Sequence, residues 1–140
     1  MFCMVSIQKT DDFAKVRDIR IKIFKEMGLS ESDILDEDDK ILEQFLIIHD
    51  GNAVGSFRLR DTNNFHKIER MGILTEYQSK GLGKLTLDEI KMYSKKTGKS
   101  KIILDSIYDV SDFYVKSGFV EVGEIYFKVG IPHVNMYFEL

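Results

Sequence analysis

Hydrophobic positions in the first half of the chain follow two spacings, one typical of strands and one of helices. From Thr10 to Gly28, apolar residues recur every three or four positions after a cluster of polar capping residues, which predicts an amphipathic helix closed by Gly28. Residues 5–8 form a short strand candidate before this helix. Residues 45–48 and 53–59 flank Asp50-Gly51-Asn52, a turn signal that predicts a β-hairpin.

The remaining segments complete a mixed pattern of helices and strands. Residues 29–43 combine acidic with apolar positions and predict a loop followed by a short, partly exposed helix. We next expect a strand over 67–74, a helix over 83–98 that ends at Thr97-Gly98, and a buried strand over 101–105. A short helix over 110–116 and two closing strands over 119–129 and 134–140 follow. The order β-α-α-β-β-β-α-β-α-β-β predicts an α/β fold of the α+β kind, with about six or seven strands and about four helices.

Length and composition narrow the class of protein. A chain of 140 residues suits one domain over residues 1–140. No apolar run approaches the roughly 18 residues of a membrane span, and we expect a cytoplasmic protein with no membrane partner. The net charge of −3 argues against a nucleic-acid partner. Cys3 is the single cysteine, and three histidines without paired spacing predict no metal site.

A glycine-rich hexapeptide, Gln78-Ser79-Lys80-Gly81-Leu82-Gly83, lies between an apolar run and the start of a predicted helix. Unpaired N–H groups and the positive end of the dipole make a helix N-terminus a seat for phosphate. The stretch does not fit a Walker loop, because Gln78 replaces the first glycine and Leu85 replaces the hydroxyl residue. It does not fit a dinucleotide fingerprint either, since Thr86 is not small and the loop lies past the middle of the chain. The loop still indicates a nucleotide-like cofactor.

The loop resembles the Q/R-x-x-G-x-G/A motif of the GNAT N-acetyltransferases. A second motif of that family, Y-x-x-x-G-F, matches the stretch from Tyr114 to Phe119. Arg20 with Phe24, Glu69-Arg70, and residues 130–136 are similar to the ElaA/YjcF-like branch. The resemblance covers almost the whole chain and implies the GNAT acyl-CoA N-acyltransferase fold.

The resemblance also implies where acetyl-coenzyme A would bind. It places the cofactor in a V-shaped gap between the fourth and fifth strands, opened by a bulge near Met71-Gly72-Ile73. Backbone groups of Met71 and Ile73 would hold the pantetheine arm, and the Ile73 N–H would polarise the thioester carbonyl. The pyrophosphate would contact the N–H groups of Gln78, Ser79, Lys80, Gly81, Leu82, Gly83 and Lys84. Phe113 is expected beside the cofactor, and Asp105, where the branch has an amide, would either accept from a pantetheine amide or repel anionic groups.

Two proton transfers need side chains. Tyr114 matches the tyrosine that protonates the departing thiolate in the family. An amine with a pKa of about 10.4 is almost entirely protonated at pH 7, so a base matters more than an acid. Glu69 is the candidate base, but it can instead form an ion pair with Arg58, Arg60 or Arg70, depending on where the bulge falls. His133, His66 and a chain of water molecules are the alternatives.

The sequence thus predicts an N-acetyltransferase that moves acetyl directly from acetyl-coenzyme A to a primary amine of a small molecule or protein, with no metal and no covalent enzyme intermediate. The rival interpretation is a non-catalytic sensor or partner-binding module that only binds coenzyme A. The acids at 31–39 and the lysines at 91–101 are either solvated surface, or an acidic rim for a cationic amine and a basic area near the phosphates. A longer acyl chain, transfer to a hydroxyl, and a homodimer through the C-terminal strands remain open.

Overall fold

A computed structural model of the protein describes residues 4–140; the prediction about Cys3 lies outside these residues. Seven strands form one sheet in the order β1-β2-β3-β4-β5-β7-β6, and only the β4–β5 pair is parallel. The strands are β1 (Ser6–Lys9), β2 (Glu43–His49), β3 (Asn52–Asp61), β4 (Phe65–Ile73), β5 (Lys101–Ile107), β6 (Val120–Lys128) and β7 (Ile131–Glu139). The helices are α1 (Phe13–Lys25), α2 (Glu31–Ile34), α3 (Leu82–Lys96) and α4 (Ser111–Lys116), with short 3-10 turns η1 (Glu37–Lys40), η2 (Thr75–Tyr77) and η3 (Tyr108–Val110). This order confirms the predicted one.

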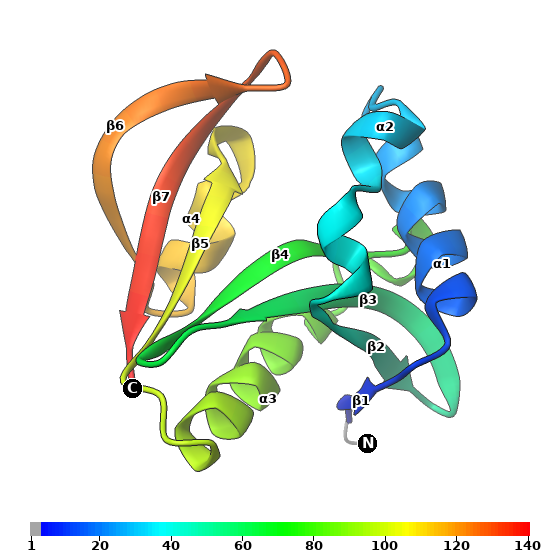
Figure 1. The fold of residues 1–140 in the computed structure, drawn as a ribbon, viewed down its shortest axis with the longest axis horizontal. Helices are drawn as coiled ribbons and strands as arrows, with labels where there is room; N and C mark the ends of the chain where they lie inside the picture. The colour runs from blue at the N-terminus through cyan, green and yellow to red at the C-terminus, as the bar shows by residue number, and fades with distance from the viewer. Residues whose placement is uncertain (1–3) are drawn as a thin grey trace.

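The helices divide between the two faces of the sheet (Figure 1). Helices α1 and α2 lie over the β2–β4 part on one side, and α3 crosses the opposite side. Helix α4 packs beside the start of α3, where Phe113 reaches Gly83. None of the helices described between residues 4 and 140 combines the length and apolar character needed to cross a membrane.

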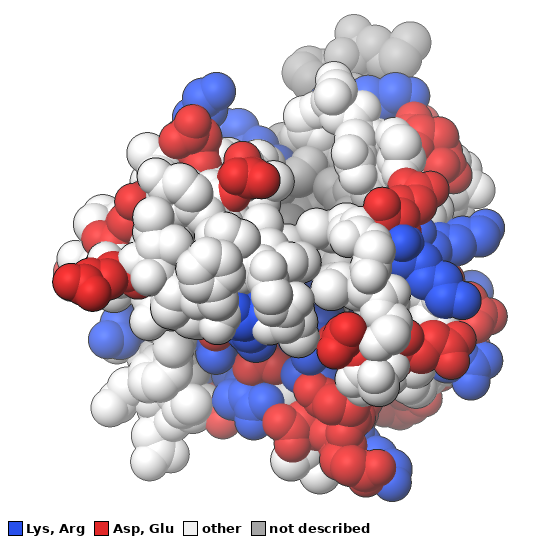
Figure 2. All heavy atoms as spheres, turned by 90° about the horizontal axis from the view of Figure 1, so that it is seen from above, with Lys and Arg blue, Asp and Glu red and all other residues white. Residues whose placement is uncertain are grey.

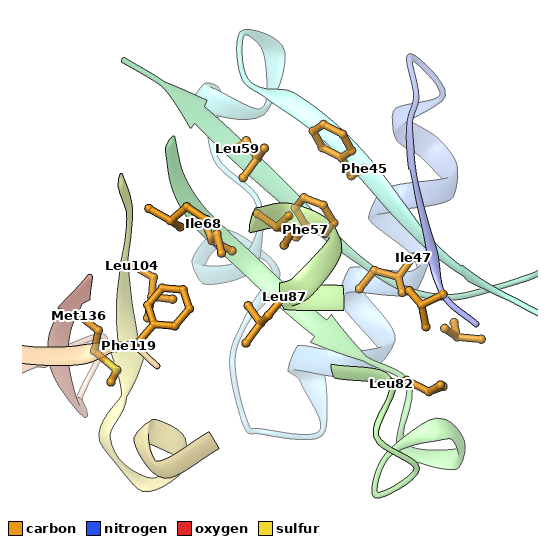
Figure 3. Close-up of a cluster of buried hydrophobic side chains, with 14 of the residues drawn as sticks. Phe45, Ile47, Phe57, Leu59, Ile68, Leu82, Leu87, Leu104, Phe119 and Met136 are labelled. Atoms are coloured by element: carbon orange, nitrogen blue, oxygen red, sulfur yellow. The ribbon is translucent and has the colours of Figure 1, made fainter. Parts of the chain in front are cut away.

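The main hydrophobic core fills the space between the sheet and α3 (Figure 3). Leu82, Leu87 and Ile90 form the buried stripe of α3, at the helical spacing that the sequence shows. They meet fully buried strand residues, among them Phe45, Phe57, Leu59, Ile68 and Ile102. Since each large apolar side chain contributes about 1.5–3 kcal/mol on burial, this layer fixes the position of the α3 N-terminus against β4.

Strand β4 contains the bulge that the sequence predicted. Ser56 of β3 pairs with Gly72, whereas Arg58 pairs with Glu69, so β4 carries one extra residue in this interval. Arg70 lies in it with a φ of 54°, a left-handed conformation that is unusual for a residue with a side chain. Beyond the bulge β4 separates from β5, because pairing between them extends only from Phe65–Lys101 to Ile68–Leu104.

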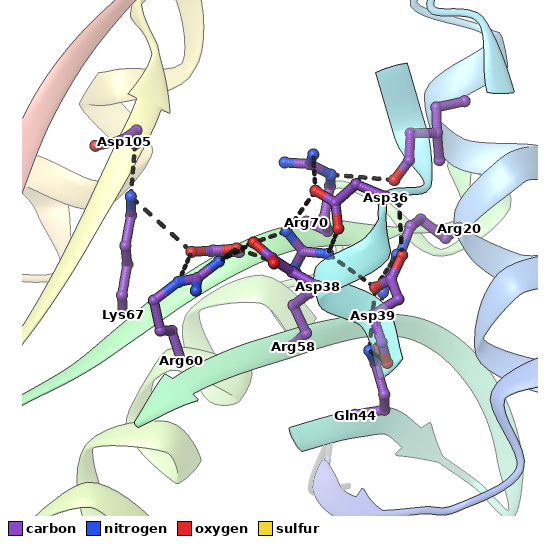
Figure 4. Close-up of polar contacts among 12 residues, drawn as sticks. Arg20, Asp36, Asp38, Asp39, Gln44, Arg58, Arg60, Lys67, Arg70 and Asp105 are labelled. Carbon is purple, nitrogen blue, oxygen red and sulfur yellow. Dashed lines mark hydrogen bonds and ion pairs between the residues drawn. The ribbon is translucent and has the colours of Figure 1, made fainter. Parts of the chain in front are cut away.

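Residues 29–43 form more structure than the sequence predicted. They contain α2 and η1, and Ile34 is buried to 1% exposure. Asp39 bonds to Arg20 of α1 and Arg58 of β3, each at 2.8 Å. Asp36 accepts from both terminal nitrogens of Arg58, at 2.7 and 3.0 Å. These ion pairs hold the segment against the sheet (Figure 4).

Candidate active site

A cavity of about 690 Å³ lies where β4 and β5 separate. Its walls come from α1, the α2 segment, β4, the loop before α3, the end of β5, and α4. The strands provide polar backbone at its centre, because the four residue pairs that join β4 to β5 stop at Ile68 and Leu104. A cavity of this size is typical of a small-molecule site.

The cavity brings together the predicted site residues with one exception. Lys80 is not in its wall; its ammonium lies 5.7 Å from the ring centre of Tyr77. The predicted residues that line it are Glu69, Met71, Gly72, Ile73, Gln78, Ser79, Gly81, Leu82, Gly83, Lys84, Asp105, Phe113 and Tyr114. The roles assigned to these residues stay predictions.

The start of α3 presents a run of open N–H groups. Within the described part of the chain, no backbone N–H from residue 79 to residue 84 has a backbone partner, and the first that does is that of Leu85, to the Gly81 carbonyl. Gly81 is the N-cap, with a φ of 80°. A β-carbon at Gly81 would touch no atom of the chain within 4 Å, so it is the left-handed backbone conformation that favours glycine here.

Gly83 is required for a different reason. A β-carbon at this position would lie 2.8 Å from the ring of Phe113. The resemblance implied that Gly83 contacts the pyrophosphate and that Phe113 lies beside the cofactor, but it implied no contact between the two residues. The structure shows that the two residues pack against each other and fix α4 against the N-terminus of α3.

The backbone of Ile73 faces the gap between the strands. The Leu74 N–H donates to the Val54 carbonyl at 2.8 Å, and successive residues of a strand direct these groups to opposite sides, so Ile73 is directed away from β3. Its carbonyl accepts from the side-chain amide of Gln78 at 2.8 Å. The predicted use of this carbonyl by a pantetheine arm therefore requires that Gln78 move or share it.

Tyr114 lies partly buried in the cavity wall. Its ring makes edge-to-face contacts with Phe113 and Phe119, at centroid distances of 4.9 and 5.8 Å. Among residues 4–140, no side chain or backbone group bonds its hydroxyl. Burial raises the pKa of Tyr114 to about 12, so the hydroxyl keeps its proton across the ordinary pH range.

Glu69 lies on the opposite face of β4 from Met71 and Ile73, because the bulge interrupts the alternation. Met71 and Ile73 pack against the core on the α3 side. Glu69 accepts from Arg58 at 2.7 Å and from Arg60 at 2.8 Å, which is the ion-pair alternative that the sequence left open. Burial favours a higher pKa for Glu69, but the hydrogen bonds from Arg60 and Arg58 outweigh it and hold the pKa below its usual value.

Asp105 enters the cavity already paired. Its carboxylate lies 2.9 Å from the Lys67 ammonium and 3.8 Å from that of Lys128. These lysines reduce the repulsion of anionic cofactor groups that the sequence suggested. His133 also lines the cavity, whereas His66 is absent from its wall and bonds Ser94 at 2.7 Å.

The two charge clusters in the sequence have mainly structural roles. Asp36, Asp38 and Asp39 pair with arginines of the sheet instead of forming an open acidic rim. Lys91 donates to the Ser117 carbonyl at 2.5 Å and lies 4.1 Å from the ring centre of Phe138. Figure 2 shows acidic and basic side chains interspersed over the face that it presents.

Sequence reasoning missed the wall that α1 and α2 contribute. This wall consists of Ile23, Phe24, Met27, Leu29, Asp33 and Ile34, and Arg70 lies beside it. Phe24 and Arg70 belonged to branch-like motifs, which was a usable signal. Among residues 4–140, no group of three or more histidine, cysteine, aspartate or glutamate residues could hold a metal ion.

Solved structures identify the fold. An N-acetyltransferase from Lactobacillus plantarum superimposes with a TM-score of 0.87 at 17% identity, covering 98% of this chain and 99% of that one. A GNAT family acetyltransferase from Elizabethkingia anophelis, solved with acetyl-CoA bound, gives 0.76 at 16% identity, with 97% and 98% covered. Escherichia coli ElaA gives 0.71 at 17% identity, with 96% and 99% covered. The fold is the GNAT acyl-CoA N-acyltransferase fold.

Sequence comparison identifies the family. A family model described as an acetyltransferase (GNAT) domain matches residues 26–140. The YyaT protein of Bacillus subtilis (strain 168) is 33% identical over 129 residues, which cover 89% of this chain and 87% of that protein. The N-acetyltransferase YjcF of the same strain is 28% identical over 120 residues, covering 84% and 86%. The chain belongs to the GNAT acetyltransferase family, and the predicted resemblance is confirmed.

Proposed function

We propose that the protein transfers acetyl from acetyl-coenzyme A directly to the primary amine of a small molecule. One observation carries this proposal: the loop with open N–H groups before α3, the Ile73 backbone and Tyr114 meet at one cavity, where β4 and β5 separate. The donors suit a phosphate-bearing ligand, and the tyrosine suits a leaving group that needs a proton.

The residues present fit acetyl-coenzyme A. The α3 N-terminus, with Gly81 as its cap, would hold the pyrophosphate through the donors of residues 79–84. The Ile73 N–H and carbonyl, on the gap side of β4, would bind the pantetheine arm. Lys84, whose ammonium is 3.4 Å from Asp88, is free to turn toward the phosphates because its side chain is 64% exposed. The co-substrate supplies an activated thioester.

In the transfer, the amine nitrogen bonds to the thioester carbon and the carbon–sulfur bond breaks. The Ile73 N–H would stabilise the negative charge that develops on the carbonyl oxygen. Tyr114, protonated at working pH, would give its proton to the departing thiolate and regain one from solvent. The attacking amine must lose a proton at the same time.

Glu69 is the proposed acceptor of the amine proton, through a bridging water molecule. Direct transfer is disfavoured because both carboxylate oxygens already accept from arginines. The lowered pKa keeps Glu69 ionised, so its carboxylate is in the form that can accept a proton. Arg58 and Arg60 fix its position.

The cofactor site can be tested by thermal shift with a matched pair of variants. Gly81→Ala and Gly98→Ala both place a β-carbon on a left-handed glycine with no atom within 4 Å, but only Gly81 lines the cavity. Both should lose about 1–2 kcal/mol of stability from the strain. Acetyl-CoA at a hundred times its dissociation constant should stabilise the parent and Gly98→Ala by about 2.7 kcal/mol. Gly81→Ala should respond much less.

Free-thiol release with a panel of amines then tests catalysis. Stabilisation by acetyl-CoA with no thiol release from any amine would favour the sensor interpretation. An equal response of Gly81→Ala and Gly98→Ala would contradict the placement of the phosphates on the α3 N-terminus.

We further infer that two copies pair through the edge strand β6. Its apolar side chains are unusually open for a soluble domain: Val120, Val122, Ile125 and Phe127 are 49–74% exposed. An unprotected edge strand with such side chains offers backbone and apolar contacts to a second copy.

A further inference from the structure

Arg70 has hydrogen-bond donors in the cavity that the protein does not use. Its Nε donates to the Ile34 carbonyl at 3.1 Å, and its Nη2 donates to Asp36 at 3.2 Å. An arginine has five N–H donors, and within the described residues the two on Nη1 and the second on Nη2 have no partner. Figure 4 shows this free end of the guanidinium directed away from α2.

The bulge explains why Arg70 lies there. In a regular strand, neighbouring side chains point to opposite faces of the sheet. Here Glu69 and Arg70 both contact the α2 side: Glu69 through Arg58, which also binds Asp36, and Arg70 through Asp36 and Ile34. The left-handed φ of Arg70 costs about 1 kcal/mol or more, so the surrounding structure holds the side chain in this position against strain.

Glu69 and Asp105, two carboxylates of the cavity wall, are paired with cations, whereas Asp33 bonds only the neutral Ser30 in the described chain and Arg70 shares its carboxylate partner. Glu69 binds Arg58 and Arg60, and Asp105 binds Lys67 at 2.9 Å. Asp33 accepts from the Ser30 hydroxyl at 2.9 Å. Asp36, which contacts Arg70, is shared with both terminal nitrogens of Arg58 at shorter distances. The unused N–H donors of Arg70 therefore offer an anionic ligand group a place to bind.

Apart from Asp33, the neighbouring wall is apolar. Ile23, Phe24, Met27, Leu29 and Ile34 line the cavity from α1 and the α2 segment. The cavity of about 690 Å³ must also hold the pantetheine arm, which leaves room for a small acceptor. We propose that the acceptor is an amine that also carries a carboxylate and an apolar body, with the carboxylate bound end-on by Nη1 and Nη2 of Arg70. This proposal rests on the proposed function.

The shape of the Arg70 guanidinium group supports a carboxylate as its ligand. Two parallel N–H donors on one planar group match the two oxygens of a carboxylate, which a lysine ammonium cannot do. The amine would then lie toward Glu69, the residue before Arg70, and the apolar body would lie against α1. The pairing of Asp36, Asp38 and Asp39 with arginines also disfavours a polycationic amine at this site.

Paired acceptors test the proposal. L-leucine, L-phenylalanine and L-methionine are compared with their primary amides, which keep the amine and the side chain but lack the charge. The kcat/KM ratio of acid to amide is measured by thiol release in the parent, Arg70→Gln and Arg70→Lys. The acid-to-amide ratio of the parent is then divided by that of the variant. This quotient no longer depends on the difference in amine pKa between acid and amide, because that difference enters both ratios equally. We expect that quotient to be about ten to a hundred for Arg70→Gln, with Arg70→Lys between.

Arg17→Gln is the matched control, because Arg17 contacts only its exposed neighbour Asp18 and does not line the cavity. It should leave the ratio unchanged. Acetyl-CoA should still raise the melting temperature of Arg70→Gln, which shows that the variant folds and binds cofactor. An unchanged ratio in Arg70→Gln, or a parent that prefers spermidine to every amino acid, would overturn the proposal.

A binding measurement covers the case of no turnover. Each acid and amide is added to the protein saturated with coenzyme A, and the further rise in melting temperature is recorded. The acids should add a larger rise than the amides in the parent but not in Arg70→Gln. Absence of any such difference would overturn the inference about Arg70, whereas absence of both the acetyl-CoA shift and thiol release would instead refute the proposed function.

Discussion

Tyr114 is held in place by packing and not by hydrogen bonds. Its ring is fixed between Phe113 and Phe119, the residue lines the cavity, and its hydroxyl has no partner in the described chain. Removal of that hydroxyl should therefore leave the fold nearly unchanged, because no protein group loses a bond. This separation makes the residue well suited to a test of catalysis.

We expect Tyr114→Phe to lower kcat by about a hundredfold or more, as for other positioned general acids. The acetyl-CoA thermal shift should be retained, because the hydroxyl does not contact the α3 N-terminus. Tyr137→Phe, at a partly buried tyrosine outside the cavity wall, is the control and should keep full activity. Full activity in Tyr114→Phe would show that the thiolate leaves unprotonated or takes its proton from water.

At the level of single residues, the sequence predicted the location of backbone groups better than the direction of side chains. Gly81 and Ile73 could be placed in the cavity wall because the motif determines the course of the backbone, independently of side-chain direction. The face of Glu69 could not be predicted, since one extra residue in β4 reverses it. Arg70 was missed as a cavity residue for the same reason.

Among the elements, the segment of α2 and η1 depends most on distant partners. Asp39 is 5% exposed in its side chain and bonds to Arg20, Arg58 and Gln44, which belong to α1, β3 and β2. The local sequence of this segment has weak helical character, so its two short turns form because these arginines balance its acids. That is why the sequence alone predicted only a loop and one exposed helix.

Asp39→Asn should destabilise the protein by about 3–5 kcal/mol, because it leaves Arg20 and Arg58 buried without their shared anion. Urea unfolding followed by circular dichroism measures this change. Glu37→Gln is the control, since its pair with Lys40 is on the surface, and it should cost less than about 1 kcal/mol. A loss in Asp39→Asn as small as that of Glu37→Gln would contradict the role of the network.

The same network predicts the acid limit of stability. Hydrogen bonds from Arg58 lower the pKa of Asp36 from 3.8 to about 2, and the pKa values of Asp39 and Glu69 are also lowered. Lowered pKa values stabilise the fold above the unfolded-state values, and this stabilisation is lost as protons bind. The unfolding free energy should therefore fall between about pH 4 and pH 2.

For the whole molecule, the exposed edge at β6 raises the question of assembly. Strand β6 is the last strand of the sheet and pairs only with β7 among the described strands. Phe127 is 74% exposed there. We expect light scattering after size exclusion to give twice the mass of the 16.2 kDa chain.

Phe127→Lys should shift that mass toward the monomer, because a charge on the edge strand opposes pairing. Met92→Lys, at a side chain of α3 that is 66% exposed, is the control and should not change it. A monomeric parent would refute pairing through β6. The sequence had left open a homodimer through the C-terminal strands, to which β6 belongs.

The separation of β4 from β5 also has a mechanical consequence. Only four residue pairs join the two halves of the sheet, compared with seven between β5 and β7. Helix α3 packs against β1, β4 and β5 and so connects the two halves of the sheet. Under a pulling force the molecule should separate first between β4 and β5. The gap proposed to admit a ligand is therefore also the mechanically weakest part of the sheet, and a ligand bound across it should raise the force needed to separate the two halves.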